Sequence, residues 1–566
     1  MNTERLNQDI QTLQDHKDEW AARPIAAKID LLLQTRKRLG ERGEAWVDAS
    51  VRGKRIDPRS PWVGEEWMSG PWALAAAING YLDTLRALSE GRLPKLRKVS
   101  TRANGQVVVR VFPNNIFETL LLSGITAEVW MQPGVTEGNL ADHMAVFYKQ
   151  RNPKGKVALV LGAGNINSIP PLDALYRLYA FGHVVLLKMN PINDYLGPIL
   201  EDIFAPYVQA GYLRFAYGGA EVGNHLVHHD GIEEIHITGN VRTHDAILYG
   251  SGTEGAARKR RHDPIVAKPM TSELGSVSPT IIVPGRWSAS DIRYQAEHVV
   301  TMKLHNGGFN CVASQVLILS EAWDQRDEFV DAIRRLMRAL PPREAYYPGA
   351  AERQRNAVAA HPNAELLGGG MPRVFITGVN PNTEQEYSFD TEFFGAVYAQ
   401  TSLPGQDAAA YLRNAVRFCN EKLQGTLGAT LIVHPTTMKE LGPVLGEAIA
   451  GLRYGSVGVN VWDALAFLMA QASWGAYPGG TDDNIQSGIG VVRNSFLFDK
   501  PEKTVGYGPF YPFPRSWLHG DFSILPRPPW FVTNKTAHIT TKRVAKFAAD
   551  PSYRHLPGIF VSALMG

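Results

Sequence analysis

The fold class of this 566-residue chain follows from one stretch, Val157-Ala158-Leu159-Val160-Leu161-Gly162-Ala163-Gly164-Asn165. Its five consecutive apolar residues are typical of a buried strand, and the glycines that follow mark a tight turn. A helical apolar pattern then runs from Leu172 to Phe181. A strand that leads through a tight turn into a helix is typical of a parallel sheet covered by helices.

The same alternation surrounds this stretch. Strands are expected at 107–111, 184–188, 213–217 and 234–238, with a helix over 196–210. In parallel sheets of this type, ligands bind beyond the carboxyl ends of the strands. The turns that follow residues 161, 188, 217 and 238 are therefore the expected ligand-binding positions.

A second alternating region runs from Ser278 to about Asn460 and predicts a second α/β domain. Its expected strands are 280–283, 316–319, 374–377 and 429–433, and its expected helices are 289–303, 326–340 and 406–423. Residues 1 to about 95 place apolar side chains at helical spacing and are expected to be helical. From Phe496 onward the chain is rich in proline and aromatic residues, and its prolines are expected to break regular elements.

Composition and length limit the class of protein. A chain of 566 residues exceeds one ordinary core, so two or three domains are expected. Hydrophobic residues make up 44% and charged residues 20%, as in soluble globular proteins. A net charge of +3 gives no general attraction to nucleic acid or to an acidic membrane.

Cysteine usage and the polar N-terminus favour a cytoplasmic protein. The two cysteines cannot build a disulfide framework, and no cluster has the spacing of a zinc site, so no metal is expected. The N-terminal segment is polar, unlike a signal peptide, and no apolar run approaches the roughly 20 residues of a transmembrane helix. We therefore expect a cytoplasmic protein without membrane contact.

Cys311 is the candidate nucleophile. It ends a glycine-rich stretch, Asn306-Gly307-Gly308-Phe309-Asn310-Cys311, in front of the apolar segment 316–319. Attack by a thiol needs an accessible sulfur on a rigid support, and a turn before a buried strand provides one. A free cysteine is also a small core hydrophobe, so this assignment depends on whether the chain supplies partners for the thiol.

Two residues are candidate partners. Glu273 precedes a glycine turn and a buried strand, where partial burial raises the pKa of a carboxyl and suits it to act as a general base. A surface carboxylate at a strand edge is the alternative. Asn165 follows the first strand closely, so its amide can point at a developing oxyanion. An asparagine in a left-handed turn is the alternative there.

Three positions are candidate contacts for a phosphate or a ribose. Gly219 and Gly223 lie four residues apart where a strand leads into a helix, which lets a phosphate approach the backbone. A turn that needs positive φ explains the same glycines. Lys188 ends a strand at the same edge. Its side chain either contacts a ligand or is exposed to solvent. The basic run 258–262 either holds a phosphate or forms a solvated loop.

Together and in this order, the motifs resemble those of the aldehyde dehydrogenase superfamily. That family carries Lys-Pro-x-Glu, Gly-x-x-x-Gly, Phe-Thr-Gly-Ser, Glu-Leu-Gly-Gly-Lys, Gly-Gln-x-Cys and Glu-x-Phe-Gly-Pro among its motifs. The resemblance covers residues 100 to 490. The matching segments are Gly164-Asn165-Ile166, Lys188-Met189-Asn190-Pro191, Gly219 to Gly223, Ile237-Thr238-Gly239-Asn240, Glu273-Leu274-Gly275-Ser276, Gly308-Phe309-Asn310-Cys311, Glu392-Phe393-Phe394-Gly395-Ala396 and Trp474-Gly475-Ala476-Tyr477.

The resemblance implies a role for each matched residue. Cys311 corresponds to the nucleophile, Asn165 with the Cys311 backbone amide to the oxyanion hole, and Glu273 to the base that activates water. The implied reaction is the oxidation of a small-molecule aldehyde to its acid through a thiohemiacetal and a thioester, with NAD or NADP as cofactor. The implied cofactor contacts are Lys188, Gly219, Gly223, Thr238, Gly239, Glu392 and Phe394.

The resemblance also implies the domain organisation of a homodimer or homotetramer. Residues 1–100 are the helical part of a Rossmann-type cofactor domain, which continues over 101–268 and includes an oligomerisation arm near 125–152. An α/β catalytic domain follows over 269–470. Residues 471–566 form an oligomerisation and C-terminal extension.

Several departures from the family pattern leave alternatives open. Pro191 stands where the family has an acidic residue that binds the adenosine ribose of NAD, so either NAD or NADP is possible. Phe309 replaces a glutamine, and the chain has some similarity to the acyl-CoA reductase branch. A CoA-dependent reductase is therefore one alternative, although the presence of Glu273 favours hydrolysis. A catalytically silent structural or binding paralogue is another.

The aromatic residues of the C-terminal extension also have alternative roles. They are expected to pack on a neighbouring subunit or on the catalytic domain, because exposed aromatic residues at this density cause aggregation. The alternatives are that they line or cover a substrate channel, or that they rest on a membrane.

Overall fold

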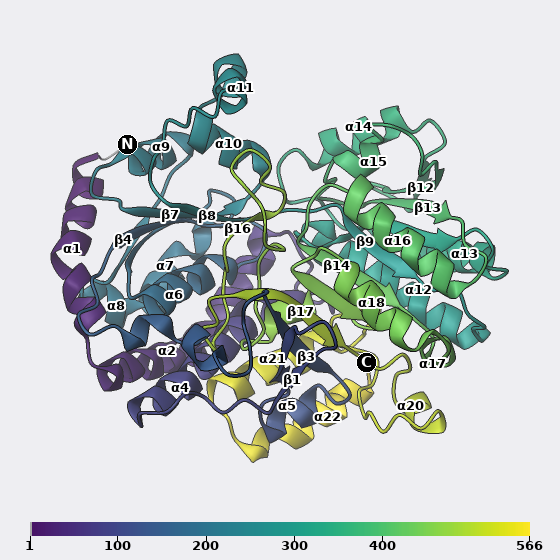
Figure 1. The fold of residues 1–566 in the computed structure, drawn as a ribbon, viewed down its shortest axis with the longest axis horizontal. Coiled ribbons are helices and arrows are strands. Elements are labelled where there is room, and N and C mark those ends of the chain that lie inside the picture. Colours follow the sequence, from purple (N-terminus) through teal and green to yellow (C-terminus); the bar gives the residue numbers. More distant parts are fainter. Residues whose placement is uncertain (1–2) are drawn as a thin grey trace.

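The computed structural model describes residues 3–566 and contains two β-sheets flanked by helices. Figure 1 shows the strands β4, β7 and β8 in the left half of the molecule, and β9, β12, β13 and β14 in the right half. The α/β class expected from the sequence is confirmed. No helix within residues 3–566 is long and apolar enough to cross a membrane.

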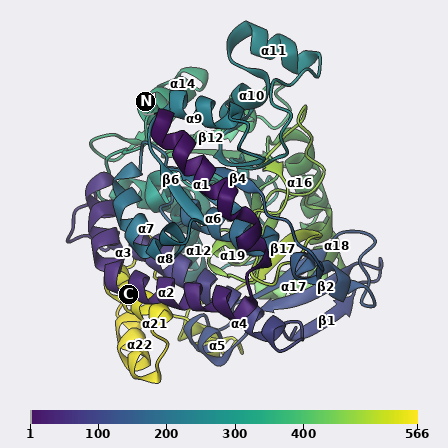
Figure 2. The same cartoon turned by 90° about the vertical axis from the view of Figure 1, so that its left-hand side faces the viewer.

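The N-terminal region is helical, as predicted. Its helices are α1 (Thr3–Ala22), α2 (Ile25–Gly53), α3 (Val63–Trp67) and α4 (Ala73–Ser89). Helix α1 lies along the smaller sheet, where the indole N–H of Trp20 donates to the carbonyl of Leu178 at 3.1 Å (Figure 2). The N-terminal helices therefore form part of the layer that covers this sheet.

The smaller sheet has the strand order β16-β8-β7-β4-β5-β6, and all pairs except β16–β8 are parallel. Its strands are β4 (Val157–Leu161), β5 (Val184–Lys188), β6 (Leu213–Ala216), β7 (Glu234–Gly239), β8 (Met270–Leu274) and β16 (Gly488–Ile489). The order of strand addition reverses at β4, between β5 and β7. Such a reversal opens a crevice at the carboxyl ends of the strands.

The helices of this region are α6 (Ile169–Phe181), α7 (Gly197–Ile203), α8 (Ala205–Gln209), α9 (Ala220–His228), α10 (Val241–Tyr249) and α11 (Gly252–Arg260). The single helix expected over 196–210 is wrong, because Phe204 separates two short helices. Pro206 lies in the first turn of α8. Proline lacks the N–H that would continue the hydrogen bonds of α7, but it fits the first turn of a new helix.

The larger sheet has the strand order β1-β2-β3-β17-β15-β14-β9-β10-β13-β12-β11. Its central strands are buried and parallel, and each expected strand of the second region is present. The strands are β1 (Lys98–Thr101), β2 (Val107–Phe112), β3 (Thr126–Met131), β9 (Ser278–Ile282), β10 (Ser314–Ser320), β11 (Glu365–Leu367), β12 (Arg373–Val379), β13 (Val397–Leu403), β14 (Gly428–Ile432), β15 (Ser456–Val459) and β17 (Pro501–Tyr507).

Helices pack along this sheet and include the three that the sequence predicts. They are α12 (Ala289–Leu304), α13 (Arg326–Ala339), α14 (Ala350–Ala360), α15 (Tyr387–Asp390), α16 (Ala408–Lys422), α17 (Pro435–Leu441), α18 (Pro443–Gly451) and α19 (Leu465–Leu468). A short helix, α5 (Ile116–Leu121), connects β2 to β3.

The C-terminal extension is more regular than its prolines suggest. It supplies β17 and the helices α20 (Arg515–Leu518), α21 (Ala537–Ala549) and α22 (Leu556–Leu564). Strand β17 lies between β15, which runs parallel to it, and β3, which runs antiparallel. The prolines predicted to break regular elements, Pro509, Pro512, Pro514 and Pro526, lie outside the helices and strands between β17 and α21, while Pro501 begins β17 and Pro557 lies in the first turn of α22.

The strand pairing relates the expected domains to the two sheets. Strand β8 follows the boundary expected at residue 268 and pairs with β7 in the smaller sheet. The arm expected near 125–152 contains β3, which pairs with β2 and with β17 in the larger sheet. The pairing of this arm with a second subunit stays a prediction.

Candidate active site

One cavity of about 970 Å³ lies where the two sheets face each other. It is bordered by the carboxyl ends of β4, β5 and β7 and by the segments that lead into β10 and β13. This is the sheet edge at which the sequence predicts ligand binding. All ten predicted site residues line this cavity: Asn165, Lys188, Gly219, Gly223, Thr238, Gly239, Glu273, Cys311, Glu392 and Phe394.

The end of helix α12 positions Cys311. Two residues in left-handed conformation, Asn306 with φ 55° and Gly307 with φ 68°, turn the chain sharply after the helix. Cys311 follows this turn, is partly exposed to the cavity, and stands just before the buried strand β10. Cys419 differs from it, because it is 1% exposed and lies in a hydrophobic core.

Glu273 is a buried carboxyl in the same cavity as the thiol. It lies near the end of β8, is 1% exposed, and lines the cavity together with Cys311. The indole N–H of Trp474 donates to its Oε2 at 2.9 Å. Burial, with a smaller contribution from Asp173, raises the pKa of Glu273 to about 7. The alternative of a surface carboxylate is therefore wrong.

The same burial acts on the thiol. Loss of solvent, followed by the nearby Glu273 carboxylate, raises the pKa of Cys311 well above its usual value. Cys311 is therefore a thiol at rest, and it needs a base to become a nucleophile. Glu273 lines the same cavity, its charge acts on the thiol, and its Oε1 has no hydrogen-bond partner within residues 3–566, so it is the base available to take that proton.

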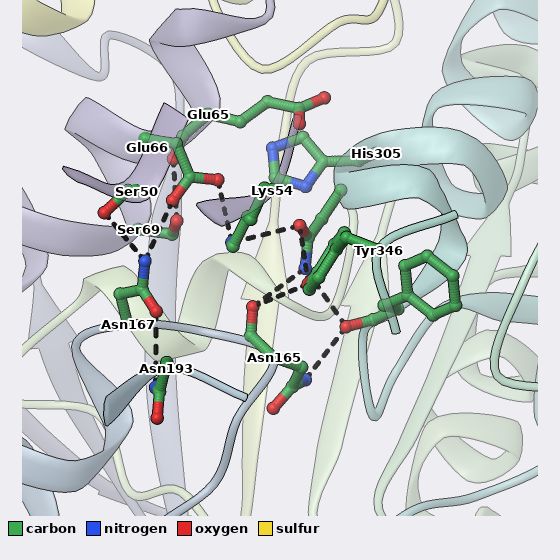
Figure 3. A network of polar contacts seen from close by, with 12 residues as sticks. Ser50, Lys54, Glu65, Glu66, Ser69, Asn165, Asn167, Asn193, His305 and Tyr346 are labelled. Carbon is green, nitrogen blue, oxygen red and sulfur yellow. Dashed lines mark hydrogen bonds and ion pairs between the residues drawn. The ribbon is translucent and has the colours of Figure 1, made fainter. Parts of the chain in front are cut away.

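The amide of Asn165 is held in a fixed orientation. Its Nδ2 donates to the carbonyl oxygen of Phe309 at 2.9 Å, and Nδ2 of Asn306 donates to the same oxygen at 3.1 Å (Figure 3). An amide nitrogen carries two hydrogens, so one N–H of Asn165 remains for a ligand in the cavity. Asn165 does not have positive φ, so the alternative of a left-handed turn residue is wrong.

A buried polar network supports this arrangement from behind (Figure 3). The ammonium group of Lys54 pairs with Glu66 at 2.7 Å and donates to Oδ1 of Asn306 at 3.1 Å. Nδ2 of Asn306 donates to the carbonyl of Asn165 at 3.2 Å, and the hydroxyl of Tyr346 lies 3.0 Å from the same carbonyl. The network joins the N-terminal helices to the two segments that carry Asn165 and Cys311.

The sequence gives no sign of this network at Lys54 and Glu66. They lie outside every recognised motif, and Lys54 and Asn306 are 252 residues apart. Asn306 is different, because it stands in the glycine-rich stretch before Cys311, where a left-handed turn is expected.

The strand-to-helix turn at Gly219 has room for a ligand. A side-chain carbon added at Gly219 or Gly223 would meet no atom within 4 Å. Neither glycine has positive φ, so the alternative of a strained turn is wrong. The turn opens helix α9, whose N-terminal N–H groups favour an anion.

Lys188 is not a solvated surface lysine. It is 8% exposed at the end of β5, and burial lowers its pKa, with a partial offset from Asp194. Thr238 and Gly239 end β7 at the same edge. Strands β4, β5 and β7 are neighbours, so these residues border a single crevice.

Glu392 and Phe394 close the opposite side of the cavity. A side-chain carbon at Gly275 would lie 2.0 Å from a carboxylate oxygen of Glu392, so a larger residue there would force the Glu392 side chain to move. Burial raises the pKa of Glu392 to about 8, with a partial offset from Lys303. Arg353 donates to the carbonyl of Phe394 at 3.0 Å and fixes this segment.

The basic run 258–262 lies outside the cavity. Most of it forms the end of helix α11, which projects from the top of the molecule in Figure 1. Arg258 pairs with Asp263, Lys259 with Asp245, and Arg261 with Glu254. The expected loop is therefore wrong for residues 258–260, which lie in a helix, and a phosphate site at this run stays a prediction.

Comparison with known proteins agrees with this geometry. The sequence model of the aldehyde dehydrogenase family matches residues 73–366. Coniferyl aldehyde dehydrogenase of Pseudomonas sp. (strain HR199) is 25% identical over 218 residues, 38% of this chain. That match spans only 40% of the length of the relative.

Two solved structures share the fold over most of their length. NADP-dependent glyceraldehyde-3-phosphate dehydrogenase from Bacillus halodurans, in complex with NADP, superposes with a TM-score of 0.58 and 19% identity, over 89% of this chain and 91% of that one. NAD-dependent aldehyde dehydrogenase from Sinorhizobium meliloti gives a TM-score of 0.58 and 15% identity, over 89% and 87%. The family model covers more than half of the sequence, and this chain therefore belongs to the aldehyde dehydrogenase family.

Proposed function

We propose that this protein oxidises an aldehyde to a carboxylic acid with NAD or NADP, through a thioester on Cys311. One observation carries the proposal: Cys311, the buried Glu273 and Asn165 line the same cavity, and burial together with the Glu273 carboxylate raises the pKa of the Cys311 thiol. A nucleophile, a base and an oxyanion donor are the groups that this reaction needs.

The first step is addition of the thiol to the carbonyl carbon of the aldehyde. Glu273 takes the thiol proton, the sulfur forms a bond to carbon, and the carbonyl oxygen takes the negative charge. The remaining N–H of Asn165 faces this charge. The backbone N–H of Cys311, which has no hydrogen-bond partner within residues 3–566, is the second donor. Each such donor typically contributes about 3 kcal/mol.

The cavity fits a nicotinamide dinucleotide. The open space at Gly219 and Gly223 lets a pyrophosphate approach the backbone, and Lys188 lies where it can bind a ribose hydroxyl or a phosphate. Thr238, Gly239, Glu392 and Phe394 would hold the rest of the molecule. When bound, this cofactor supplies the acceptor for a hydride.

Release of the acid depends on Glu273. Glu273 first passes the thiol proton to solvent. With a pKa of about 7, a large share of Glu273 is then ionised at neutral pH and can take a proton from water. The resulting hydroxide attacks the thioester carbon, the C–S bond breaks, and the sulfur leaves as Cys311 thiolate, which is then protonated.

The acidic residues that line the cavity within the described chain are Glu273, Glu352, Asp390 and Glu392, and none follows Lys188 closely. This favours tolerance of the 2′-phosphate of NADP, because a carboxylate at that position would repel it. We therefore propose that the enzyme accepts both cofactors. The cytoplasmic location and the homodimer or homotetramer stay predictions. Light scattering, which gives the mass of the particle in solution, tests the oligomeric state.

A steady-state assay tests the proposed function. Purified protein is given an aldehyde with NAD or NADP, with and without CoA, and the acid is measured by chromatography. We expect acid and reduced cofactor in equal amounts without CoA. Strict dependence on CoA with no acid product would instead identify an acyl-CoA reductase. Cofactor binding without turnover of any aldehyde would identify a silent paralogue.

A further inference from the structure

A second, smaller cavity meets the first one at Cys311. Its volume is about 60 Å³, and it shares only Ile169 and Cys311 with the large cavity. Sixty cubic ångströms is far too small for a dinucleotide, so this cavity is the place for the aldehyde. Its wall consists of Met68, Ser69, Ile166, Ile169, His305, Asn310, Cys311, Val312, Trp462, Ala464, Leu465, Phe467, Leu468, Trp474 and Trp530.

No Asp, Glu, Lys or Arg stands among these wall residues in the described chain. Most polar groups of the wall are already bonded to protein. The hydroxyl of Ser69 donates to Glu65, Asn310 donates to the carbonyl of His305, and the indoles of Trp462 and Trp474 donate to Val312 and Glu273.

Two neutral nitrogens of the wall remain without a partner within residues 3–566, Nε1 of Trp530 and Nε2 of His305. Burial lowers the pKa of His305 to about 4, so its ring is uncharged at neutral pH. The guanidinium of Arg493 lies 3.5 Å from the ring centre of Phe467, but Arg493 itself is not part of the wall. The wall therefore offers no cation to a carboxylate or phosphate.

We propose that the substrate is an aldehyde with an uncharged, apolar tail, and that Trp530 sets how long that tail can be. This rests on the proposed function, because the cavity binds a substrate only if Cys311 is the nucleophile. A carboxylate or phosphate on the tail would lose its water here and gain no opposite charge, which costs several kcal/mol in proteins. Such a loss corresponds to at least about 100-fold in kcat/KM.

Trp530 is held firmly in the wall and is 3% exposed. In the adjoining backbone, the N–H of Val532 donates to the hydroxyl of Thr301 on α12 at 3.1 Å. The indole of Trp62 donates to the carbonyl of Val532 at 3.0 Å. The ring of Phe531 stacks on His298 at 5.3 Å. The C-terminal extension, which lies beyond the residues that the family model matches, therefore closes this cavity.

The first arm of the test compares butanal with succinic semialdehyde, which adds a carboxylate to the same four-carbon chain. We expect kcat/KM for butanal to be at least about 100-fold higher. Equal or higher activity with succinic semialdehyde would overturn the inference and leave the proposed function intact. If neither these two nor any other aldehyde is oxidised, the proposed function fails, and the inference fails with it.

The second arm measures the ratio of kcat/KM for hexanal to that for propanal in Trp530→Ala and Trp530→Phe. A larger cavity should raise this ratio at least about tenfold in the alanine variant and less in the phenylalanine variant, since each methylene in an apolar pocket is worth about 10-fold or more. Trp517→Ala is the matched control, because Trp517 is 52% exposed in the same extension.

An unchanged ratio in both Trp530 variants, or an equal change in Trp517→Ala, would overturn the role of Trp530. If the alanine variant does not fold, as judged by its melting temperature, the phenylalanine variant decides. Its ring keeps most of the packing, so a ratio like that of the unmodified enzyme would contradict the inference.

Discussion

At the scale of single residues, the chemistry of the site depends on burial, which shifts the pKa values of its side chains. Glu273 is 1% exposed and has a pKa of about 7, so it can accept and return a proton at neutral pH. Cys311 is a thiol at rest for the same reason. Neither property follows from residue type alone, because burial in the fold is the largest cause of both pKa shifts.

The pKa of Glu273 predicts the pH dependence of the reaction. The active form is the carboxylate, so kcat should rise with pH through a midpoint near 7 and then level off. Glu273→Gln cannot ionise and should lower kcat by about 10²- to 10⁴-fold, with no midpoint near pH 7. A pH–rate series on both proteins checks this, and an unshifted midpoint in the glutamine variant would assign it to another group.

At the scale of secondary-structure elements, a substitution in the first turn of α9 can distinguish an effect on cofactor binding from an effect on stability. In Gly223→Ala the new methyl meets no protein atom, and alanine favours a helix over glycine by about 1 kcal/mol. We expect an equal or higher melting temperature together with a higher KM for the cofactor. Thermal unfolding and a cofactor titration check this, and an unchanged cofactor KM would show that the dinucleotide does not approach Gly223.

A second prediction at this scale concerns the ion pair that joins the end of α2 to α3. Lys54 and Glu66 are 1% and 0% exposed, so Lys54→Met leaves a buried carboxylate without its cation. Removing one partner of such a pair costs about 3–5 kcal/mol. Lys54→Met/Glu66→Gln should restore most of that stability, because no lone charge remains.

Urea unfolding of the single and double variants measures these free energies of unfolding. The double variant still lacks the bond from Lys54 to Asn306, so its kcat should stay below that of the unmodified enzyme at unchanged cofactor KM. Full recovery of kcat would mean that the network serves stability alone and does not orient the segments of Asn165 and Cys311.

At the scale of the whole molecule, the C-terminal extension packs into the larger sheet of the same chain. Strand β17 lies inside the larger sheet between β15 and β3, and Phe510 packs against Trp287 with ring centres 5.5 Å apart. Phe510 thus packs as expected of the aromatic residues, whereas Trp517 and Phe522 are 52% and 80% exposed. Trp530 lines the small cavity. This contact fits the alternative in which aromatic residues of the extension line a substrate channel.

Truncation distinguishes the parts of this extension. Deletion of residues 500–566 removes β17 and separates β1–β3 from the catalytic strands, so we expect no cooperative thermal unfolding. Deletion of 551–566 removes only the α22 region, where Leu556 and Ile559 are the buried apolar side chains, and should lower the melting temperature by a few degrees. Equal melting temperatures for both truncations would contradict this division.

The sequence predicts most of the two sheets, because strands such as 157–161 and 184–188 are short apolar runs bounded by turns. It also predicts ten of the residues that line the large cavity, because they stand in ordered motifs. It does not predict β17, whose partners β3 and β15 are distant in the chain, or the pair Lys54–Glu66. These features arise from contacts between distant segments, for which local composition carries no signal.

The most direct test of the central claim is the mass of the peptide that contains Cys311 during turnover. The unmodified protein is mixed with excess butanal and cofactor, quenched with acid during turnover and digested. We expect the acyl group of butanal on Cys311, because the thioester is the intermediate that precedes hydrolysis, and none on Cys419, which is buried away from the cavity. Continued turnover with Cys311 unmodified, or an acyl group on Cys419, would contradict the account.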